Sequence, residues 1–84
     1  MANIIVYSSN ACPYCDRAKE LLIKKGLAFE EIRVDVYPQK RTEMIEITGK
    51  RTVPQIIINN QPIGGCDDLF ALNHSGELDK ILEG

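Results

Sequence analysis

The segment Cys12-Pro13-Tyr14-Cys15 lies between a short apolar run and a stretch with helical spacing. The run covers residues 3–7 and is rich in β-branched residues, which predicts a buried strand. A helix is predicted over residues 13–25, because proline suits the first helical turn and Gly26 is a natural stop. Cys12 is therefore expected at the N-terminal edge of a helix that directly follows a strand.

The rest of the chain predicts an α/β fold in the order β-α-β-α-β-β-α. The first two strands are joined through a helix, so they should be parallel, whereas the last two are joined by a tight turn and should be antiparallel. Asp67 or Asp68 is a candidate cap for the third helix, and an amphipathic turn or two should follow Gly76. A four-stranded mixed sheet with helices on both faces results. The further predicted elements are a strand at 28–34, a helix at 38–47, and strands at 55–58 and 62–64.

Length and composition restrict the function classes. The chain has 84 residues, which predicts one domain over residues 1–84. A net charge of −2 argues against a dedicated nucleic-acid binder. No apolar run reaches the roughly 18 residues of a membrane span, and the first residues do not resemble a signal peptide, so a cytoplasmic protein is expected. Three cysteines do not make a disulfide scaffold.

A Cys-x-x-Cys pair can be half of a zinc site, a redox dithiol or a chance spacing. A structural zinc site needs about four ligands. The remaining soft candidates are Cys66 and His74, which are not at a zinc-knuckle spacing and would have to be brought across the fold. The placement of the pair after a strand and before a helix favours a redox dithiol and no metal.

The predicted helix gives the two cysteines different roles. A free cysteine has a pKa of about 8.5, and only the thiolate is a nucleophile. Helix N-termini favour anions, and the N–H groups of Tyr14 and Cys15 could point back at the Cys12 sulfur. Cys12 is expected to be exposed and to attack, whereas Cys15, one turn into the helix, should face inward and resolve.

Three segments together resemble the dithiol glutaredoxins of the thioredoxin-like superfamily, most closely bacterial members of the glutaredoxin 3 type. They are Cys12-Pro13-Tyr14-Cys15, Thr52-Val53-Pro54-Gln55 and Gly64-Gly65-Cys66-Asp67-Asp68. The resemblance covers nearly the whole chain and implies a thioredoxin-like fold. It also implies a glutathione-dependent thiol–disulfide oxidoreductase, acting as a monomer on protein disulfides and glutathione mixed disulfides. Glutathione would be the reductant, regenerated by glutathione reductase.

The resemblance also implies a glutathione site. Pro54 should follow a cis peptide bond, which would present the backbone of Val53 to the cysteinyl part of glutathione. The N-terminus of the third helix suits the γ-glutamyl carboxylate, and Asp67 suits the ammonium group. Arg41 is the first candidate for the glycyl carboxylate, with Arg51 the weaker one. The full set of implied glutathione-binding residues is Tyr14, Arg41, Thr52, Val53, Pro54, Gly65, Cys66, Asp67 and Asp68.

Each implied residue also has a structural interpretation. Pro54 could be an ordinary trans proline opening a strand, and the two aspartates could be only helix caps. Cys66 is expected to be a buried small hydrophobe, with a redox role as the alternative. His74 is expected at the surface, without the partners that a catalytic base needs.

The sequence departs from the family pattern just before the motif. Ser9 stands where many members carry a lysine, and Ala11 stands where a hydroxyl-bearing residue is common. Without that cation, Cys12 should remain acidic through the helix terminus, but less so than in lysine-bearing members.

Three rival functions stay open at this point. A thioredoxin reduced by a flavoprotein is disfavoured, because thioredoxins carry Gly-Pro where this chain has Pro13-Tyr14. An iron–sulfur carrier, in which two chains hold a cluster through Cys12 and glutathione, is disfavoured by the stiffening effect of Pro13. A structural zinc module would unfold when treated with chelators.

Overall fold

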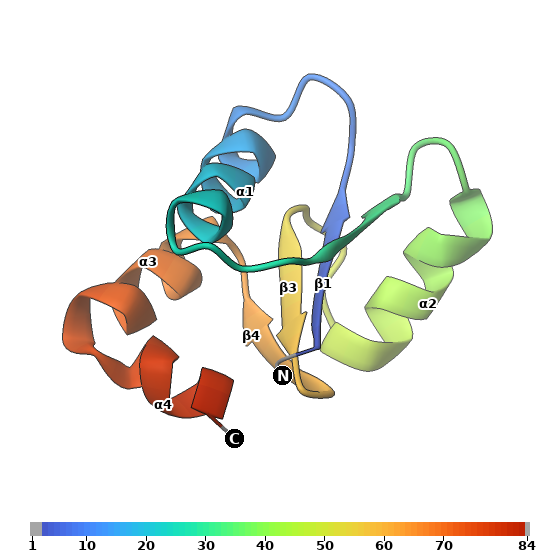
Figure 1. Ribbon diagram of the computed structural model, residues 1–84. Coiled ribbons are helices and arrows are strands. Elements are labelled where there is room, and N and C mark those ends of the chain that lie inside the picture. The colour runs from blue at the N-terminus through green and yellow to red at the C-terminus, as the bar shows by residue number, and fades with distance from the viewer. Residues whose placement is uncertain (1–2, 84) are drawn as a thin grey trace.

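The computed structural model describes residues 3–83, which form a four-stranded sheet flanked by helices (Figure 1). The strands lie in the order β2-β1-β3-β4. β1 is parallel to β2 and antiparallel to β3, and β3 is antiparallel to β4. The elements are β1 (Ile4–Ser8), α1 (Pro13–Lys24), β2 (Glu30–Arg33), α2 (Pro38–Thr48), β3 (Gln55–Ile58), β4 (Gln61–Gly64), α3 (Cys66–Ser75) and α4 (Glu77–Glu83).

The alternation of side chains along β1 divides the core into two layers. Ile4 and Val6 pack with residues of α1, α3 and α4 on one face of the sheet. Tyr7 packs with Met44 of α2 on the other face. Figure 1 shows the same division, with α1 and α3 on one side of the sheet and α2 on the other. The predicted mixed sheet with helices on both faces is confirmed.

The C-terminal part differs from the sequence prediction in two details. Gly76 adopts a left-handed conformation (φ 86°) that ends α3, so the last turns form a separate helix, α4. The N-cap of α3 is Gly65 rather than Asp67 or Asp68. The helix starts two or three residues earlier than those caps would place it, and the carboxylate of Asp68 accepts a hydrogen bond from the Gly65 N–H at 3.0 Å.

The turn between β3 and β4 ties α4 to the sheet. Asn59 and Asn60 both have positive φ angles, as the predicted tight turn requires. The Asn59 side chain accepts a hydrogen bond from the Asn3 N–H at 2.9 Å and donates one to the Ile81 carbonyl at 3.2 Å. Among residues 3–83, no helix combines the length and apolar character that crossing a bilayer requires.

The buried hydroxyl of Tyr7 makes the stability of the fold depend on pH in the alkaline range. It donates a hydrogen bond to Glu43 at 2.9 Å, and burial followed by this contact raises the pKa of Tyr7 to about 12. A phenol whose pKa is higher in the folded state stabilises the fold below the unfolded-state pKa of 10.0, and this contribution is lost as pH rises toward 12.

We therefore expect Tyr7→Phe to lower the free energy of unfolding by about 1 kcal/mol at neutral pH. The same variant should lose less stability than the wild type between pH 10 and 12. Urea unfolding across this range measures both effects, with Tyr37→Phe as the control because Tyr37 is exposed. An alkaline decline as steep in Tyr7→Phe as in the wild type would contradict this assignment.

Candidate active site

Cys12 is the N-cap of α1, which begins at Pro13. Its backbone is extended (φ −116°, ψ 97°), and its carbonyl accepts the first helical hydrogen bond from Asp16 N–H at 3.1 Å. Its sulfur accepts a hydrogen bond from the Cys15 N–H at 3.2 Å. Of the two N–H groups that the sequence predicts to face the sulfur, the one from Cys15 makes this bond. A helix-terminal N–H aimed at the sulfur stabilises a thiolate there.

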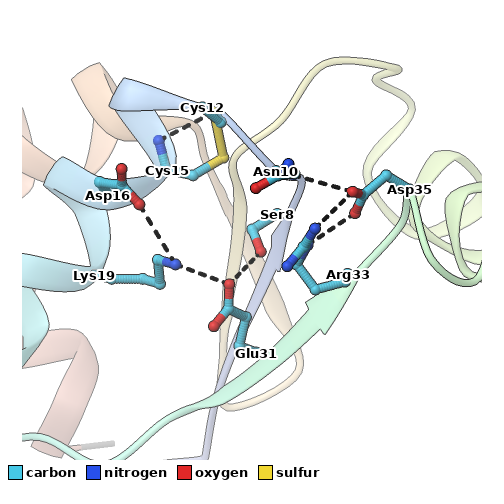
Figure 2. Close-up of polar contacts among 9 residues, drawn as sticks. All are labelled: Ser8, Asn10, Cys12, Cys15, Asp16, Lys19, Glu31, Arg33 and Asp35. Atoms are coloured by element: carbon cyan, nitrogen blue, oxygen red, sulfur yellow. Dashed lines mark hydrogen bonds and ion pairs between the residues drawn. A yellow bond between two sulfur atoms is a disulfide. The ribbon is translucent and has the colours of Figure 1, made fainter.

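Cys12 and Cys15 form a disulfide, with their Cα atoms 5.2 Å apart (Figure 2). Cys15 is fully buried, as expected for the resolving residue. Cys12 is half-buried rather than exposed. One reason is the loop that ends in Pro54, since the Val53 carbonyl oxygen lies 4.0 Å from the Cys12 sulfur. Only the sulfur of Cys12 is therefore accessible to another disulfide.

The Asp35 carboxylate binds the loop that leads into Cys12 (Figure 2). Asp35 accepts a hydrogen bond from the Asn10 N–H at 3.2 Å. Two hydrogen bonds from the Arg33 guanidinium, at 2.8 and 2.6 Å, fix that carboxylate and hold the pKa of Asp35 well below its usual range. The next loop residue, Ala11, has a left-handed backbone (φ 52°), which is uncommon for a residue other than glycine. The loop is therefore held in one conformation.

A second polar cluster joins α1 to the sheet on the inner side of the motif (Figure 2). Glu31 of β2 accepts hydrogen bonds from the buried Ser8 hydroxyl at 2.6 Å and from Lys19 at 2.8 Å. The Lys19 bond and then the Ser8 bond lower the pKa of Glu31, and the Glu31 bond raises the pKa of Lys19. Lys19 lies one helical turn after Cys15, so the Lys19–Glu31 ion pair holds the start of α1, where both cysteines lie, against β2.

A cavity of about 290 Å³ is lined by Tyr14, which lies between the two cysteines in the chain, and by Val53, whose carbonyl oxygen lies 4.0 Å from the Cys12 sulfur. The Val53–Pro54 peptide bond is cis, as the resemblance implies. Two residues of the wall, Lys50 and Gln55, are absent from the predicted set. The predicted residues that line the cavity are Tyr14, Thr52, Val53, Pro54, Gly65, Cys66, Asp67 and Asp68.

The predicted cation Arg41 is not among the residues that line this cavity. Its guanidinium donates a hydrogen bond to the Arg51 carbonyl at 2.9 Å. Lys50 is instead the cation on the cavity wall. The sequence contained a hint of this in the basic pair Lys50-Arg51, but the choice of side chain depends on how the loop folds.

The buried side chain of Gln55 holds the loop before β3 that lines the cavity. Its side chain is only 2% exposed, and its amide nitrogen donates to the Thr52 carbonyl at 3.0 Å and to the Thr52 hydroxyl at 3.3 Å. Its carbonyl oxygen is the buried side-chain atom that lacks a hydrogen-bond partner within residues 3–83. These bonds hold the segment whose backbone faces Cys12.

The N-terminus of α3 forms the opposite wall. Asp67 is exposed and lines the cavity, and Asp68 is used in the cap of the helix. Burial, with the nearby charge of Asp67 as a second cause, raises the pKa of the Cys66 thiol. That thiol is therefore a weaker nucleophile at neutral pH than an ordinary cysteine. His74 is exposed in the last turn of α3.

These features define a class. A strand leads into a Cys-x-x-Cys pair at a helix N-terminus, and a cis proline faces that pair across a cavity on a mixed four-stranded sheet. This combination is that of the thioredoxin-like thiol–disulfide oxidoreductases.

The comparison with known proteins identifies the family. The family model described as Glutaredoxin matches residues 4–63, and the chain belongs to the glutaredoxin family. Glutaredoxin 3 of Escherichia coli K12 is 53% identical over 83 residues, which cover 99% of this chain and 100% of that protein. A glutaredoxin of Pseudomonas aeruginosa is 48% identical over 82 residues, with 98% of each chain covered.

Solved glutaredoxin structures share the fold. The solution structure of a Brucella melitensis glutaredoxin is 49% identical, with a TM-score of 0.85 over 98% of this chain and 89% of that one. A buckwheat glutaredoxin–glutathione complex is 30% identical, with a TM-score of 0.89 over 98% and 77% of the two chains. The thioredoxin-like fold and the resemblance to the glutaredoxin 3 type are confirmed, and the chain is a glutathione-dependent disulfide oxidoreductase.

Proposed function

We propose that Cys12 is the nucleophile, that Cys15 resolves, and that glutathione binds in the cavity beside them as the reductant. The single observation that carries this proposal is the N-cap position of the half-buried Cys12 next to that cavity. The full burial of Cys15 supports its second role, because an incoming disulfide cannot reach a fully buried sulfur.

With a glutathionylated substrate, the Cys12 thiolate attacks the glutathione sulfur. The bond between glutathione and the substrate breaks, and the substrate leaves as a thiolate that takes up a proton. A second glutathione thiolate then attacks the Cys12-bound glutathione sulfur, which releases glutathione disulfide and restores the Cys12 thiolate. Neither step uses Cys15.

With a protein disulfide, Cys12 forms a mixed disulfide with the protein. The Cys15 thiolate attacks the Cys12 sulfur, so the protein leaves with both of its thiols reduced. The product is the Cys12–Cys15 disulfide, the state present in this structure. Two glutathione molecules reduce it and become glutathione disulfide, which glutathione reductase recycles.

The walls of the cavity match the groups of a tripeptide. The Val53 backbone and the neighbouring Thr52 and Pro54 suit the cysteinyl backbone of glutathione, and Tyr14 suits one side of it. The N–H groups of the first turn of α3, from Cys66 to Asp68, suit the γ-glutamyl carboxylate, and Asp67 suits its ammonium group. We place the glycyl carboxylate near Lys50, with Arg41 as the second choice.

The wider setting completes the proposal. The chain acts as a single domain and a monomer in the cytoplasm, on disulfide-containing or glutathionylated proteins. The rival hypothesis is a thioredoxin that is reduced by a flavoprotein. That hypothesis predicts activity with a flavoprotein thioredoxin reductase but not with glutathione and glutathione reductase.

The Cys15→Ser variant tests the division of labour. We expect it to keep turnover of a small glutathione mixed disulfide within about threefold of the wild type, because that cycle needs one thiol. Reduction of a protein disulfide should fall by about 100-fold or more, since the intramolecular thiol that resolves the mixed disulfide is then missing. Both rates are measured with NADPH, glutathione and glutathione reductase. An equal loss of both activities would refute the assignment.

A further inference from the structure

The buried glutamine at the start of β3 has a hydrogen-bonding pattern that core packing does not explain. Gln55 lies opposite Tyr7 in the register of β1 and β3, so its side chain lies on the face of the sheet that α2 covers (Figure 1). Its amide nitrogen donates two hydrogen bonds to Thr52, but within residues 3–83 its buried carbonyl oxygen has no partner. Burying an unpaired carbonyl destabilises a fold, so an apolar side chain of the same length would fill this space at a lower cost in stability.

The two hydrogen bonds close a ring over residues 52–55. The Gln55 side chain returns to the Thr52 carbonyl at 3.0 Å and to the Thr52 hydroxyl at 3.3 Å. Because pairing with β1 fixes the backbone of Gln55, these bonds also fix the orientation of the Thr52 carbonyl. The preceding carbonyl is held as well, since the Arg41 guanidinium donates to the Arg51 carbonyl at 2.9 Å. Two successive carbonyls before β3 are therefore bonded to side chains of the protein.

The next carbonyl along the chain, that of Val53, is the one that faces the active site. Its oxygen lies 4.0 Å from the Cys12 sulfur, and Val53 lines the active-site cavity. Val53 lies inside the ring that the Gln55 side chain closes, directly after the residue that this side chain binds. A rotation of the Thr52 peptide would therefore move the Val53 backbone. The buried Gln55 side chain thus sets the position of the loop backbone that lies nearest to the reactive sulfur.

We propose that Gln55 is a positioning residue for glutathione, which holds the Val53 backbone where the peptide groups of the tripeptide can pair with it. This inference rests on the proposed function, in which glutathione binds in the cavity that Val53 lines. A glutamine supplies a donor to Thr52, which an apolar side chain cannot do. Pairing with a peptide needs a fixed direction for the groups of the loop, whereas the thiolate is stabilised by the start of α1. Loss of the donor therefore weakens recognition of glutathione and leaves the chemistry of Cys12 intact.

The Gln55→Met variant tests this assignment, because methionine has nearly the same length but has neither the N–H donor nor the carbonyl. In the glutathione reductase-coupled assay with the glutathione mixed disulfide of 2-mercaptoethanol, its KM for glutathione should be about fivefold higher than that of the wild type. Its kcat should stay within about twofold. Reduction of the Cys12–Cys15 disulfide by dithiothreitol, which has no peptide groups, should also stay within about twofold of the wild type. The pH midpoint for alkylation of Cys12 should not change.

Urea unfolding of the same variant separates positioning from a merely structural role. The variant loses two hydrogen bonds to Thr52, an exposed residue whose freed groups can bind water, and it also loses the unpaired buried carbonyl. We therefore expect its urea midpoint to match or exceed that of the wild type. A structural role alone predicts the reverse, with a lower midpoint and an unchanged KM for glutathione. Gln55→Leu repeats the comparison with a second apolar side chain.

Gln61→Met is the matched control, because it makes the same replacement at an exposed position of β4. It should leave both the KM for glutathione and the urea midpoint at the wild-type values. A KM within about twofold of the wild type in folded Gln55→Met, or an equal loss of rate with dithiothreitol, would overturn the positioning role. A wild type that is reduced by a flavoprotein thioredoxin reductase and not by glutathione would instead overturn the proposed function.

Discussion

Replacing Cys12 with serine is expected to lower turnover of both glutathione mixed disulfides and protein disulfides by about 10³-fold or more. Serine has nearly the same shape, but its hydroxyl is not ionised at neutral pH. The variant therefore has no thiolate for the N–H groups at the start of α1 to stabilise. The fold should be retained, because Cys12 is only half-buried and is packed in no core cluster. The measurement is the glutathione reductase-coupled rate with each substrate.

The control is the thermal unfolding of reduced Cys12→Ser beside the reduced wild type. Equal transitions show that the lost rate belongs to chemistry. Residual turnover within about tenfold of the wild type would contradict the account, and it would point to Cys66 as a second nucleophile.

The second large effect concerns stability. Ile56 is fully buried in β3, between β1 and β4, and it packs against residues of α1 and α3. We expect Ile56→Ala to lower the free energy of unfolding by about 2–5 kcal/mol, through lost apolar burial and the cavity it leaves. A domain of this size has a total of roughly 5–10 kcal/mol, so the variant should be partly unfolded at modest urea concentrations.

Ile23→Ala is the matched control, because the Ile23 side chain is 64% exposed on α1. It should change the free energy of unfolding by about 0.5 kcal/mol or less. Urea titrations of the reduced proteins compare the two. Similar midpoints for both variants would contradict the assignment of Ile56 to the core.

The sequence predicts the main elements well because their signals are local. An apolar run followed by Pro13 is enough to place a strand and the start of α1, and the turn at Asn59-Asn60 is enough to make β3 and β4 antiparallel. The start of α3 is less local. Both Asp67 and Asp68 are good caps, but Gly64 has a φ of 120° and a Cβ there would overlap the Asp68 carboxylate, so three-dimensional packing decides.

The features of the site likewise divide into those that local sequence predicts and those that depend on the folded chain. The proposed roles of Cys12 and Cys15 follow from their position at a helix end, which the sequence predicts. The cis bond before Pro54 follows from the resemblance and not from local propensity. The cation on the cavity wall could not be predicted, because the use of Lys50 rather than Arg41 depends on how the loop before β3 folds.

The account depends on the proposal that Cys12 forms a thiolate more readily than a free cysteine does. Ser9 supplies no cation, so the thiolate must be stabilised by the start of α1, where the Cys15 N–H lies 3.2 Å from the sulfur. The Cys66 thiol has the opposite setting, since burial raises its pKa.

The most direct test is alkylation of the reduced protein with iodoacetamide as a function of pH, with each modified cysteine identified by mass spectrometry. The account predicts that Cys12 reacts first, with a midpoint below about 8, compared with about 8.5 for a free cysteine. Cys15 and Cys66 should react later and only at higher pH. A midpoint for Cys12 at or above about 8, or earlier reaction of either of the other two thiols, would contradict it.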